Sequence, residues 1–286
     1  MMYPDLSSFL RDGKAALAKG PIGMIMVEDE IEVRSTIDHH LRCGFQTLVV
    51  FAGSEIVPLA DLDANVHWVT HDMSEDAALE TAVNGVIAAA PAKWLYYCYN
   101  SEYLHFPFSE SRTVGEMLAF NAEERRETIM TFTIDLYAGD LDAAPNAVSL
   151  ENAHMDTSGY YALARWNGEA YEERQLDFFG GLRWRFEEHM PYMRRRIDRV
   201  SLFRARAGLQ LQANHTFNMP EFNTYACPWH NNLTSAICSF RTAKALKRNP
   251  GSRDIIHDFK WRSSTQFEWS SSQLMNLGLM EPGQWF

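Results

Sequence analysis

The stretch Gly20–Phe51, GPIGMIMVEDEIEVRSTIDHHLRCGFQTLVVF, decides the fold class. Its apolar run Ile22–Val27 ends at three acidic residues, which is typical of a strand buried on both faces. From Ile31 to Arg42 apolar residues recur at roughly helical spacing, and Gly44 follows where a helix end favours a residue that tolerates positive φ. Thr47–Phe51 reads as a second buried strand. Strand, helix and strand together predict a βαβ unit with a right-handed crossover.

The same alternation continues through the first half of the chain. We predict strands at Val66–Thr70 and Trp94–Tyr99, separated by an alanine-rich helix at Glu75–Ala90. A further helix is expected at Val114–Arg125 and a strand at Thr128–Tyr137. This order predicts an α/β fold with a mostly parallel sheet flanked by helices.

The second half is less regular. Asp140–Gly181 is polar and rich in loop residues, which predicts a functional loop or a small insertion. We expect strands at Gly208–Ala213 and Asp254–Trp261, a helix at Ser235–Leu246, and a helix with a tail over Ser263–Phe286. No segment reads as a domain linker, so a single domain over residues 1–286 is predicted.

Composition narrows the class of protein. A hydrophobic fraction of 46% predicts a sizeable core, and a net charge of -11 disfavours nucleic-acid binding. The apolar segments are too short for a signal peptide or a membrane span, so we expect no transmembrane segment and a cytoplasmic location. The cysteines lack the spacing of a zinc site or a disulfide framework. They are Cys43, Cys98, Cys227 and Cys238.

Several short motifs, in order, resemble bacterial family 2-type glycosyltransferases, which have the GT-A fold. A strand ending in Val27-Glu28-Asp29-Glu30 leads to a helix that ends in the pattern His-x-x-x-Gly-Phe, here His40 to Phe45. The run from Trp94 to Pro107 keeps the frame of the family's Asp-x-Asp-Glu motif. Further matches are Ile134–Tyr137, Gly180-Gly181-x-Arg183 and, with one residue inserted, His257–Lys260.

The resemblance implies a nucleotide-sugar donor and a glycan or other hydroxyl acceptor, with a role in polysaccharide biosynthesis. It implies a donor-binding half at 1–137 and an acceptor-side half at 138–286. The donor-binding residues that it implies are Glu28, Asp29, Glu30, Gly53, Ser54, Asn100, Ser101 and Arg183. Catalytic roles fall to Glu102, His257 and Asp258, and an acceptor-side cluster is predicted at His215, Asn218 and Glu221.

The motif that would hold the metal departs from the family pattern. In the family, the two Asp residues of the motif approach a Mn or Mg ion that bridges the diphosphate, because hard cations prefer oxygen ligands. Tyr99 and Ser101 stand at those positions, and only Glu102 remains. A phenol and a hydroxyl are poor ligands for such an ion at neutral pH.

Three interpretations follow. The enzyme works without a metal and uses Arg183 or Arg185 to balance the diphosphate charge. Alternatively, Glu102 and His257, with Asp258, form a reduced metal site. The third is a non-catalytic protein that binds a glycan or a partner.

Each candidate also has a purely structural interpretation. Glu28 to Glu30 would suit a solvated helix N-terminus because of the helix dipole. His39 and His40 are expected to pack or cap the same helix, and His257 and Asp258 would equally suit a polar strand end. The tryptophans Trp229, Trp261, Trp269 and Trp285 would stack on sugars or fill a core, and we expect core positions.

Overall fold

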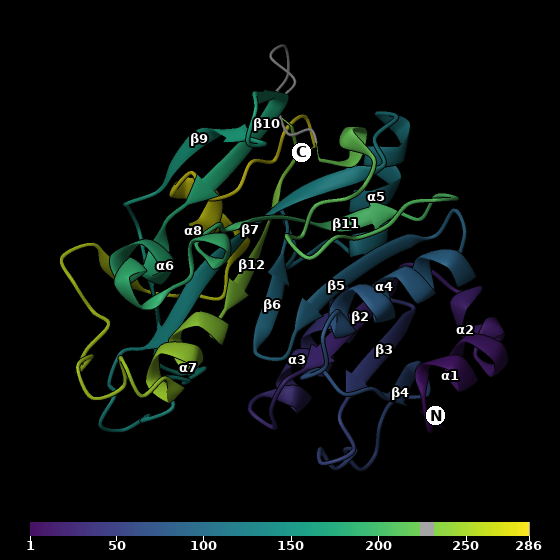
Figure 1. The fold of residues 1–286 in the computed structure, drawn as a ribbon, viewed down its shortest axis with the longest axis horizontal. Coiled ribbons are helices and arrows are strands. Elements are labelled where there is room, and N and C mark those ends of the chain that lie inside the picture. Colours follow the sequence, from purple (N-terminus) through teal and green to yellow (C-terminus); the bar gives the residue numbers. More distant parts are fainter. Residues whose placement is uncertain (224–231, 286) are drawn as a thin grey trace. The chain divides into compact units, whose positions relative to one another are not determined.

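The structure is a computed structural model that describes residues 1–223 and 232–285 (Figure 1). Cys227 and Trp229 lie outside the described residues. The chain divides into two compact units. Unit 1 comprises Met1–Leu104, Ser111–Met130 and Val200–Asn223. Unit 2 comprises His105–Glu110, Thr131–Arg199 and the chain from residue 224 onward.

Unit 1 is built on a mostly parallel sheet. Its strands lie in the order β1-β4-β3-β2-β5-β11, and only β11 runs antiparallel to its neighbour β5. The central strands are continuous apolar runs because both faces of the sheet are covered by helices. The strands are β1 (Met2–Tyr3), β2 (Ile22–Val27), β3 (Thr47–Ala52), β4 (Val66–Thr70), β5 (Trp94–Tyr99) and β11 (Asp198–Arg204).

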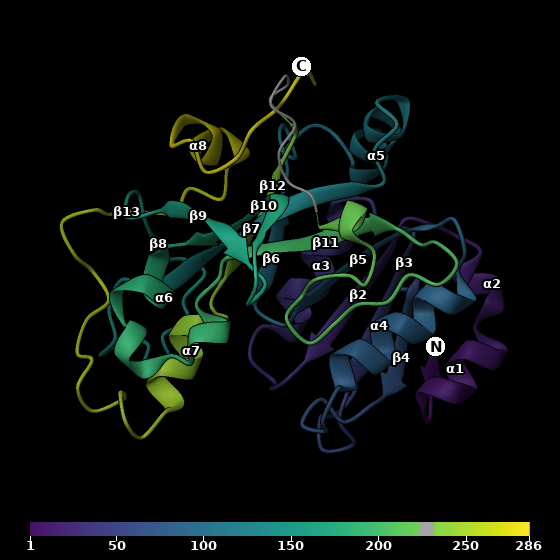
Figure 2. The same ribbon diagram turned by 45° about the horizontal axis from the view of Figure 1, so that its top comes forward.

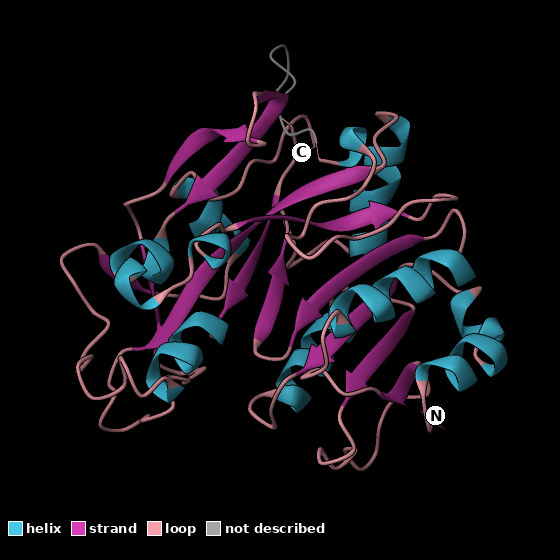
Figure 3. Cartoon of the chain, viewed as in Figure 1, coloured by secondary structure: helices cyan, strands magenta, loops and turns pink. Residues whose placement is uncertain are grey.

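The chain moves across this sheet in two directions. From β2 it steps through α3 (Val33–Arg42) to β3, whereas from β4 it passes through α4 (Ala78–Ala89) back over the sheet to β5. Right-handed crossovers in opposite directions place α3 and α4 on opposite faces. Figure 3 shows α4 lying with α1 (Leu6–Asp12) and α2 (Lys14–Leu17) along one face. The unit also contains α5 (Val114–Glu123) and a short 3-10 helix at Pro220–Phe222.

Local sequence explains the helix ends in unit 1. Thr113 and Glu116 form a capping box that starts α5, because each side chain accepts a hydrogen bond from the other residue's backbone N–H. Past the end of α3, Gly44 has φ 93°, the left-handed region that glycine favours.

Unit 2 is organised around β7 (Thr128–Ala138). Its neighbour β12 (Ser235–Ser239) pairs with it in parallel, and β8 (Ala153–Asp156) pairs with it antiparallel and carries β13 (Ser264–Gln266). A separate ribbon consists of β9 (Tyr161–Trp166) and β10 (Tyr171–Phe179) (Figure 2). The remaining elements of unit 2 are α6 (Gly181–Arg185), α7 (Arg241–Arg248), α8 (Ser271–Asn276) and 3-10 helices at Glu187–His189 and Tyr192–Arg194. Strand β6 (Glu102–His105) has Glu102 to Leu104 in unit 1 and His105 in unit 2.

The predicted α/β class, with a mostly parallel sheet flanked by helices, is confirmed. Three predictions in the second half are wrong. Ser235–Leu246 is not one helix but β12 followed by α7, and Gly208–Ala213 and Asp254–Trp261 lie in loops. The loop-rich stretch Asp140–Gly181 contains three strands, β8 to β10. Among the described residues, no helix combines the length and apolarity needed to cross a membrane.

Candidate functional site

In unit 1 the chain adds strands on one side of β2, namely β3 and β4, and then crosses back to add β5 on the other side. The strand order therefore reverses between β2 and β5. These neighbouring parallel strands end together, since Met26 of β2 pairs with Tyr99 of β5. In open α/β sheets, ligands bind outside the carboxyl ends of the strands at such a switch point. The loop Glu28–Ile31 follows β2 and Asn100 follows β5, so the structure brings together two of the predicted donor-binding segments.

Asn100 holds the loop that follows β2. Its Oδ1 accepts a hydrogen bond from the backbone N–H of Glu28 at 2.9 Å. Its Nδ2 donates to the carbonyl oxygens of Asp29 and Ile31, at 3.0 and 2.9 Å, and to Asp29 Oδ1 at 2.8 Å. Asn100 is fully buried. Its amide therefore orders the loop, a role different from the predicted direct contact with a donor.

Ser101 adds a second tie. It has φ 63°, which an ordinary residue adopts only when its surroundings hold it there. Its Oγ donates to the carbonyl oxygen of Ile31 at 2.9 Å, and its N–H donates to Thr36 Oγ1 of α3 at 2.9 Å. Strand β5, the β2 loop and helix α3 are thus joined at one point.

The loop presents its acidic side chains differently. Glu28 and Glu30 are exposed, whereas Asp29 is buried and its Oδ1 accepts from the N–H of Ile31 at 3.0 Å. At the end of the adjacent β3, Gly53 is buried and Ser54 is exposed. Of the predicted donor-binding residues in unit 1, Glu28, Glu30 and Ser54 are the ones open to solvent.

Glu102 does not have the setting of a metal ligand. Its side chain is fully buried, and Oε2 accepts the backbone N–H of Tyr99 at 2.9 Å. The hydroxyl of Ser101 is already used to bond Ile31. Within residues 1–223 and 232–285, no group of three His, Cys, Asp or Glu side chains is arranged to hold a metal ion. These residues do not fit a Mn or Mg site.

The paired histidines of α3 are packed into unit 1. Burial lowers the pKa of His39 to about 4 and that of His40 to about 3, so both imidazoles are neutral at pH 7. His39 Nε2 lies 2.7 Å from the carbonyl oxygen of Leu104, and His40 Nδ1 lies 2.7 Å from that of Thr36. This geometry agrees with the expected packing role.

Arg183 of unit 2 is held by its own unit. Its Nε lies 3.4 Å from Asp135 Oδ1 and donates to Thr242 Oγ1 at 3.2 Å, while a terminal nitrogen donates to the carbonyl oxygen of Arg196 at 2.7 Å. Asp135 is buried, and that burial raises its pKa although Arg183 opposes the shift. Arg183 therefore serves as the counter-ion of a buried carboxylate.

A second buried carboxylate, Asp156, was not singled out by the sequence. Arg185 Nε donates to its Oδ2 at 2.8 Å, and its Oδ1 accepts from the Tyr137 hydroxyl at 2.6 Å and from Trp261 Nε1 at 2.9 Å. Burial raises the pKa of Asp156, with Arg185 acting against the shift. The four residues lie far apart in the sequence and share no spacing that would have revealed the cluster.

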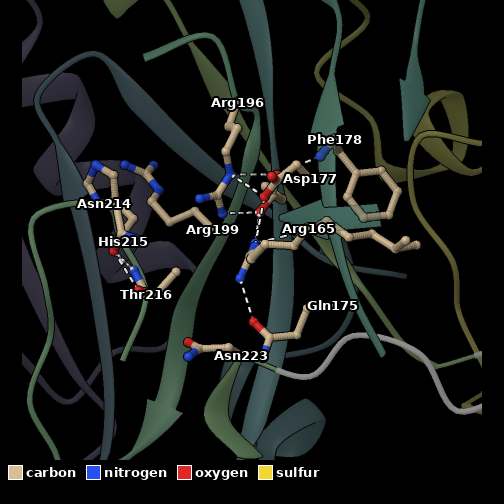
Figure 4. A network of polar contacts seen from close by, with 12 residues as sticks. Arg165, Gln175, Asp177, Phe178, Arg196, Arg199, Asn214, His215, Thr216 and Asn223 are labelled. Atoms are coloured by element: carbon tan, nitrogen blue, oxygen red, sulfur yellow. Dashed lines mark hydrogen bonds and ion pairs between the residues drawn. The ribbon is translucent and has the colours of Figure 1, made fainter. Parts of the chain in front are cut away.

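Unit 2 also holds a network of two arginines and two aspartates (Figure 4). Arg165 contacts Asp177 at 2.8 Å and Asp198 at 2.9 Å. Arg196 contacts Asp177 at 3.0 Å and also pairs with Asp198. Equal numbers of opposite charges make this network electrically neutral, and it joins β9 and β10 to the start of β11.

The predicted catalytic pair His257 and Asp258 lies in an exposed loop of unit 2. Asp258 Oδ1 accepts the N–H of Lys260 at 2.8 Å, a turn contact that leaves carboxylate capacity for further donors. Glu102 belongs to unit 1 and these two residues to unit 2, so a joint site remains a prediction.

The predicted acceptor-side residues are spread along one irregular segment of unit 1. His215 has φ 59°, and its Nδ1 lies 3.1 Å from the Tyr97 hydroxyl, with the two rings stacked. Asn218 stabilises the loop, because its Oδ1 accepts from the N–H of Gln210 and its Nδ2 donates to the carbonyl oxygen of Gly208. Glu221 is exposed. The first two therefore shape the loop, and Asn218 and Glu221 are both exposed to solvent.

The fold and the switch-point loop define an α/β protein with a candidate ligand-binding edge at the carboxyl ends of β2 and β5. Comparison with known proteins adds no family to this description. No protein-family model matches the chain, and no curated protein is significantly similar to it.

Proposed function

We propose that the chain is a glycosyltransferase that binds a nucleotide-diphosphate sugar at the switch point of unit 1 and transfers the sugar to a hydroxyl acceptor. The proposal includes the GT-A arrangement and a role in polysaccharide biosynthesis. One observation carries it. Asn100 fixes the loop Glu28–Ile31 at the edge where α/β sheets bind nucleotides, and Glu28 and Glu30 remain exposed there.

Charge decides which part of the donor this loop would contact. Two exposed carboxylates repel a diphosphate but accept hydrogen bonds well from hydroxyl groups. We therefore assign the ribose or the sugar hydroxyls to Glu28 and Glu30. Arg183 and Arg185 are each paired with an aspartate, so we assign neither of them to the diphosphate.

The acceptor hydroxyl must lose a proton during transfer, and a general base must lie within hydrogen-bond reach of it. Asp258 and His257 are exposed neighbours, which suits such a role better than the buried Glu102 does. Under this proposal Asp258→Asn lowers transfer by orders of magnitude and leaves donor affinity unchanged. Unchanged transfer by Asp258→Asn and His257→Ala would remove both residues from the mechanism.

Calorimetric titration with UDP- and GDP-sugars, with and without Mn, tests the donor site. We expect Glu28→Gln combined with Glu30→Gln to weaken binding about tenfold or more, because hydrogen bonds to charged groups contribute roughly 1.5–3 kcal/mol each. Glu123→Gln, an exposed glutamate at the end of α5, is the matched control and should bind like the parent protein. Equal affinities for all three proteins would refute the assignment.

A second candidate is a non-catalytic protein of the same fold that binds a glycan or a partner. The observation that favours it is the replacement of both motif aspartates by Tyr99 and Ser101, which are buried. Donor binding without release of nucleotide in the presence of acceptors would support this candidate over the enzyme. Continuous release of nucleotide diphosphate would exclude it.

A further inference from the structure

The ribbon β9–β10 carries an unusual share of exposed apolar side chains. Among the described residues, four of the eleven exposed large hydrophobic side chains lie on it: Tyr161, Leu163, Trp166 and Tyr171. Water-exposed rings of this size are costly to leave uncovered, and clusters of them mark binding surfaces. Trp166 and Tyr171 are the two that face each other across the ribbon, since they are register partners.

These two rings form a fixed corner at the tip of the ribbon. Their centroids are 5.0 Å apart and their planes meet at 67°. Trp166 is 53% exposed and Tyr171 is 69% exposed, so each ring keeps a large surface open to solvent. A preformed pair of rings loses little side-chain entropy on binding, which favours recognition of a flat ligand.

Polar groups lie in the turn that follows β9 and at the start of β10. Asn167 Nδ2 donates to Glu172 Oε1 at 2.7 Å, and Asn167 Oδ1 accepts the N–H groups of Glu169 and Ala170. The Glu172 carboxylate has two oxygens and therefore retains acceptor capacity beyond the Asn167 contact. The two rings offer stacking, and Glu172, which directly follows Tyr171 in β10, offers hydrogen bonding at the same end of the ribbon.

The charged residues near Trp166 and Tyr171 favour some classes of ligand over others. The turn carries Glu169, and the start of β10 carries Glu172 and Glu173 against the single Arg174. Along the ribbon, Arg165 is neutralised by Asp177 and Asp198. A net negative tip repels phosphate, sulfate and uronate groups, so anionic lipids, nucleic acids and acidic polysaccharides are disfavoured.

We propose that this tip binds a neutral carbohydrate chain, with sugar rings stacked on Trp166 and Tyr171 and a sugar hydroxyl donating to Glu172. The assignment rests on the proposed function, because it makes this surface the place where the acceptor glycan is held. It names the acceptor class as an uncharged polysaccharide.

Affinity electrophoresis in native gels that contain dextran, glucomannan, xyloglucan or polygalacturonate tests the proposal. We expect at least one neutral polymer to retard the parent protein, and the double variant Trp166→Ala, Tyr171→Ala to weaken that binding at least tenfold. Glu172→Gln should give a smaller loss. Ile255→Ala removes an exposed apolar side chain of the same unit elsewhere and should bind like the parent. Unfolding midpoints establish that the variants fold.

Three results would overturn the proposal: no retardation by any neutral polymer, retardation by polygalacturonate alone, or equal retardation of the parent and the double variant. Loss of sedimentation with phosphatidylcholine vesicles in the double variant would assign the corner to a lipid surface instead. Titration with nucleotide sugars is run in parallel on the same proteins. Polymer retardation without any donor binding would reject the proposed enzyme and leave the carbohydrate site standing.

Discussion

The switch-point loop of unit 1 and the buried cluster of unit 2 both hold polar groups away from water, but by different chemistry. In unit 1 an uncharged amide, Asn100, bonds to backbone groups and one carboxylate. In unit 2 the carboxylates of Asp135 and Asp156 face arginines. Beside the neutral amide the side chains of Glu28 and Glu30 are exposed to solvent, whereas the buried carboxylates of unit 2 are paired with arginines. The contrast is between a loop of unit 1 that is ordered by an uncharged amide and a cluster of unit 2 that is stabilised by buried ion pairs.

The largest effect should come from breaking an ion pair in unit 2. Arg185→Gln removes the guanidinium that donates to Asp156 Oδ2 at 2.8 Å and leaves the buried carboxylate without its counter-ion. Removing one partner of a buried pair costs about 3–5 kcal/mol because the other charge remains unpaired. Urea unfolding measures the loss.

Arg194→Gln is the matched control, since Arg194 is exposed in the same unit. We expect it to change the free energy of unfolding by less than about 0.5 kcal/mol. Equal effects of the two substitutions would mean that the cluster around Asp156 contributes no more than a surface charge.

The stability of unit 1 and that of unit 2 should respond differently to acid. The unfolded pKa of histidine is 6.5, and the folded values for His39 and His40 are about 4 and 3. As pH falls below 6.5 the unfolded chain takes up protons that folded unit 1 refuses, so stability present above 6.5 is lost toward pH 4. Each histidine contributes a slope of at most about 1.4 kcal/mol per pH unit.

Unit 2 should respond in the opposite sense. Burial raises the pKa of Asp135 and Asp156, so their contribution to stability is lost as pH rises through the folded values and is recovered on acidification toward 3.8. Hydrogen-exchange protection factors at pH 7 and pH 5 should fall for β2 and α3, and hold or rise for β7 and β8. Parallel changes in both units would contradict the contrast.

A histidine variant sharpens this test. His40→Gln removes one of the buried titrating groups and should flatten the pH dependence of protection in α3. His257→Gln changes an exposed histidine of unit 2 and should leave both profiles as they are. A profile for His40→Gln as steep as that of the parent protein would assign the acid sensitivity to other groups.

Removing the hydrogen bonds that Asn100 makes to the loop after β2 should lower stability by a smaller amount, and the effect should be local. Asn100→Ala removes the partner of the Glu28 N–H and of two carbonyl oxygens, and we expect a loss of about 2–3 kcal/mol from unsatisfied groups. Asn65→Ala, an exposed asparagine of the same unit, should cost little. Exchange in residues 28–32 should increase for Asn100→Ala and stay unchanged for the control.

Asn100→Asp distinguishes a role in hydrogen bonding from a simple packing role for this side chain. The substitution retains an acceptor for the Glu28 N–H but sets a second carboxylate against Asp29. Like charges at hydrogen-bond distance repel, so this variant should be less stable at pH 7 than at pH 5. A loss that does not depend on pH would show that the Asp29 contact carries little weight.

The sequence predicted unit 1 far better than unit 2, for a physical reason. Strands such as Ile22–Val27 and Trp94–Tyr99 are buried on both faces, so their apolar runs are uninterrupted and their bounds match β2 and β5. In unit 2, the ribbon strand Tyr161–Trp166 is exposed and alternates weakly, which makes it resemble a loop. Ser235–Leu246 mixes a buried strand with a basic amphipathic helix, and a single period cannot describe both.

The candidate site was predictable only as a location. The sequence placed Glu28 to Glu30 and Asn100 at strand ends, and the switch point between β2 and β5 brings them together. Which of them face solvent depends on hydrogen bonds between residues about seventy positions apart. Nothing in the spacing of Asn100 and Ile31 shows that the amide would turn inward and the glutamates outward.

The smallest expected effect on stability is at Gly53, and a second glycine provides the contrast. Gly181 of unit 2 has φ 62°, and an added Cβ would lie 2.9 Å from Asp135 Oδ2, so Gly181→Ala should cost about 1–2 kcal/mol from the backbone alone. At Gly53 an added Cβ meets only the exposed carboxylate end of Glu55, which can swing away. Gly53→Ala should therefore change the free energy of unfolding by less than about 0.5 kcal/mol.

Gly53→Ala distinguishes an effect on nucleotide-sugar affinity from an effect on stability. If the donor packs against the end of β3, a methyl group there obstructs it, and affinity for the nucleotide sugar falls while the unfolding midpoint stays the same. Gly181→Ala should give the reverse result, a lower midpoint with unchanged affinity, because its cost lies inside unit 2. Should Gly53→Ala bind the donor like the parent protein, the donor site would be confined to the edge formed by β2 and β5, without the end of β3.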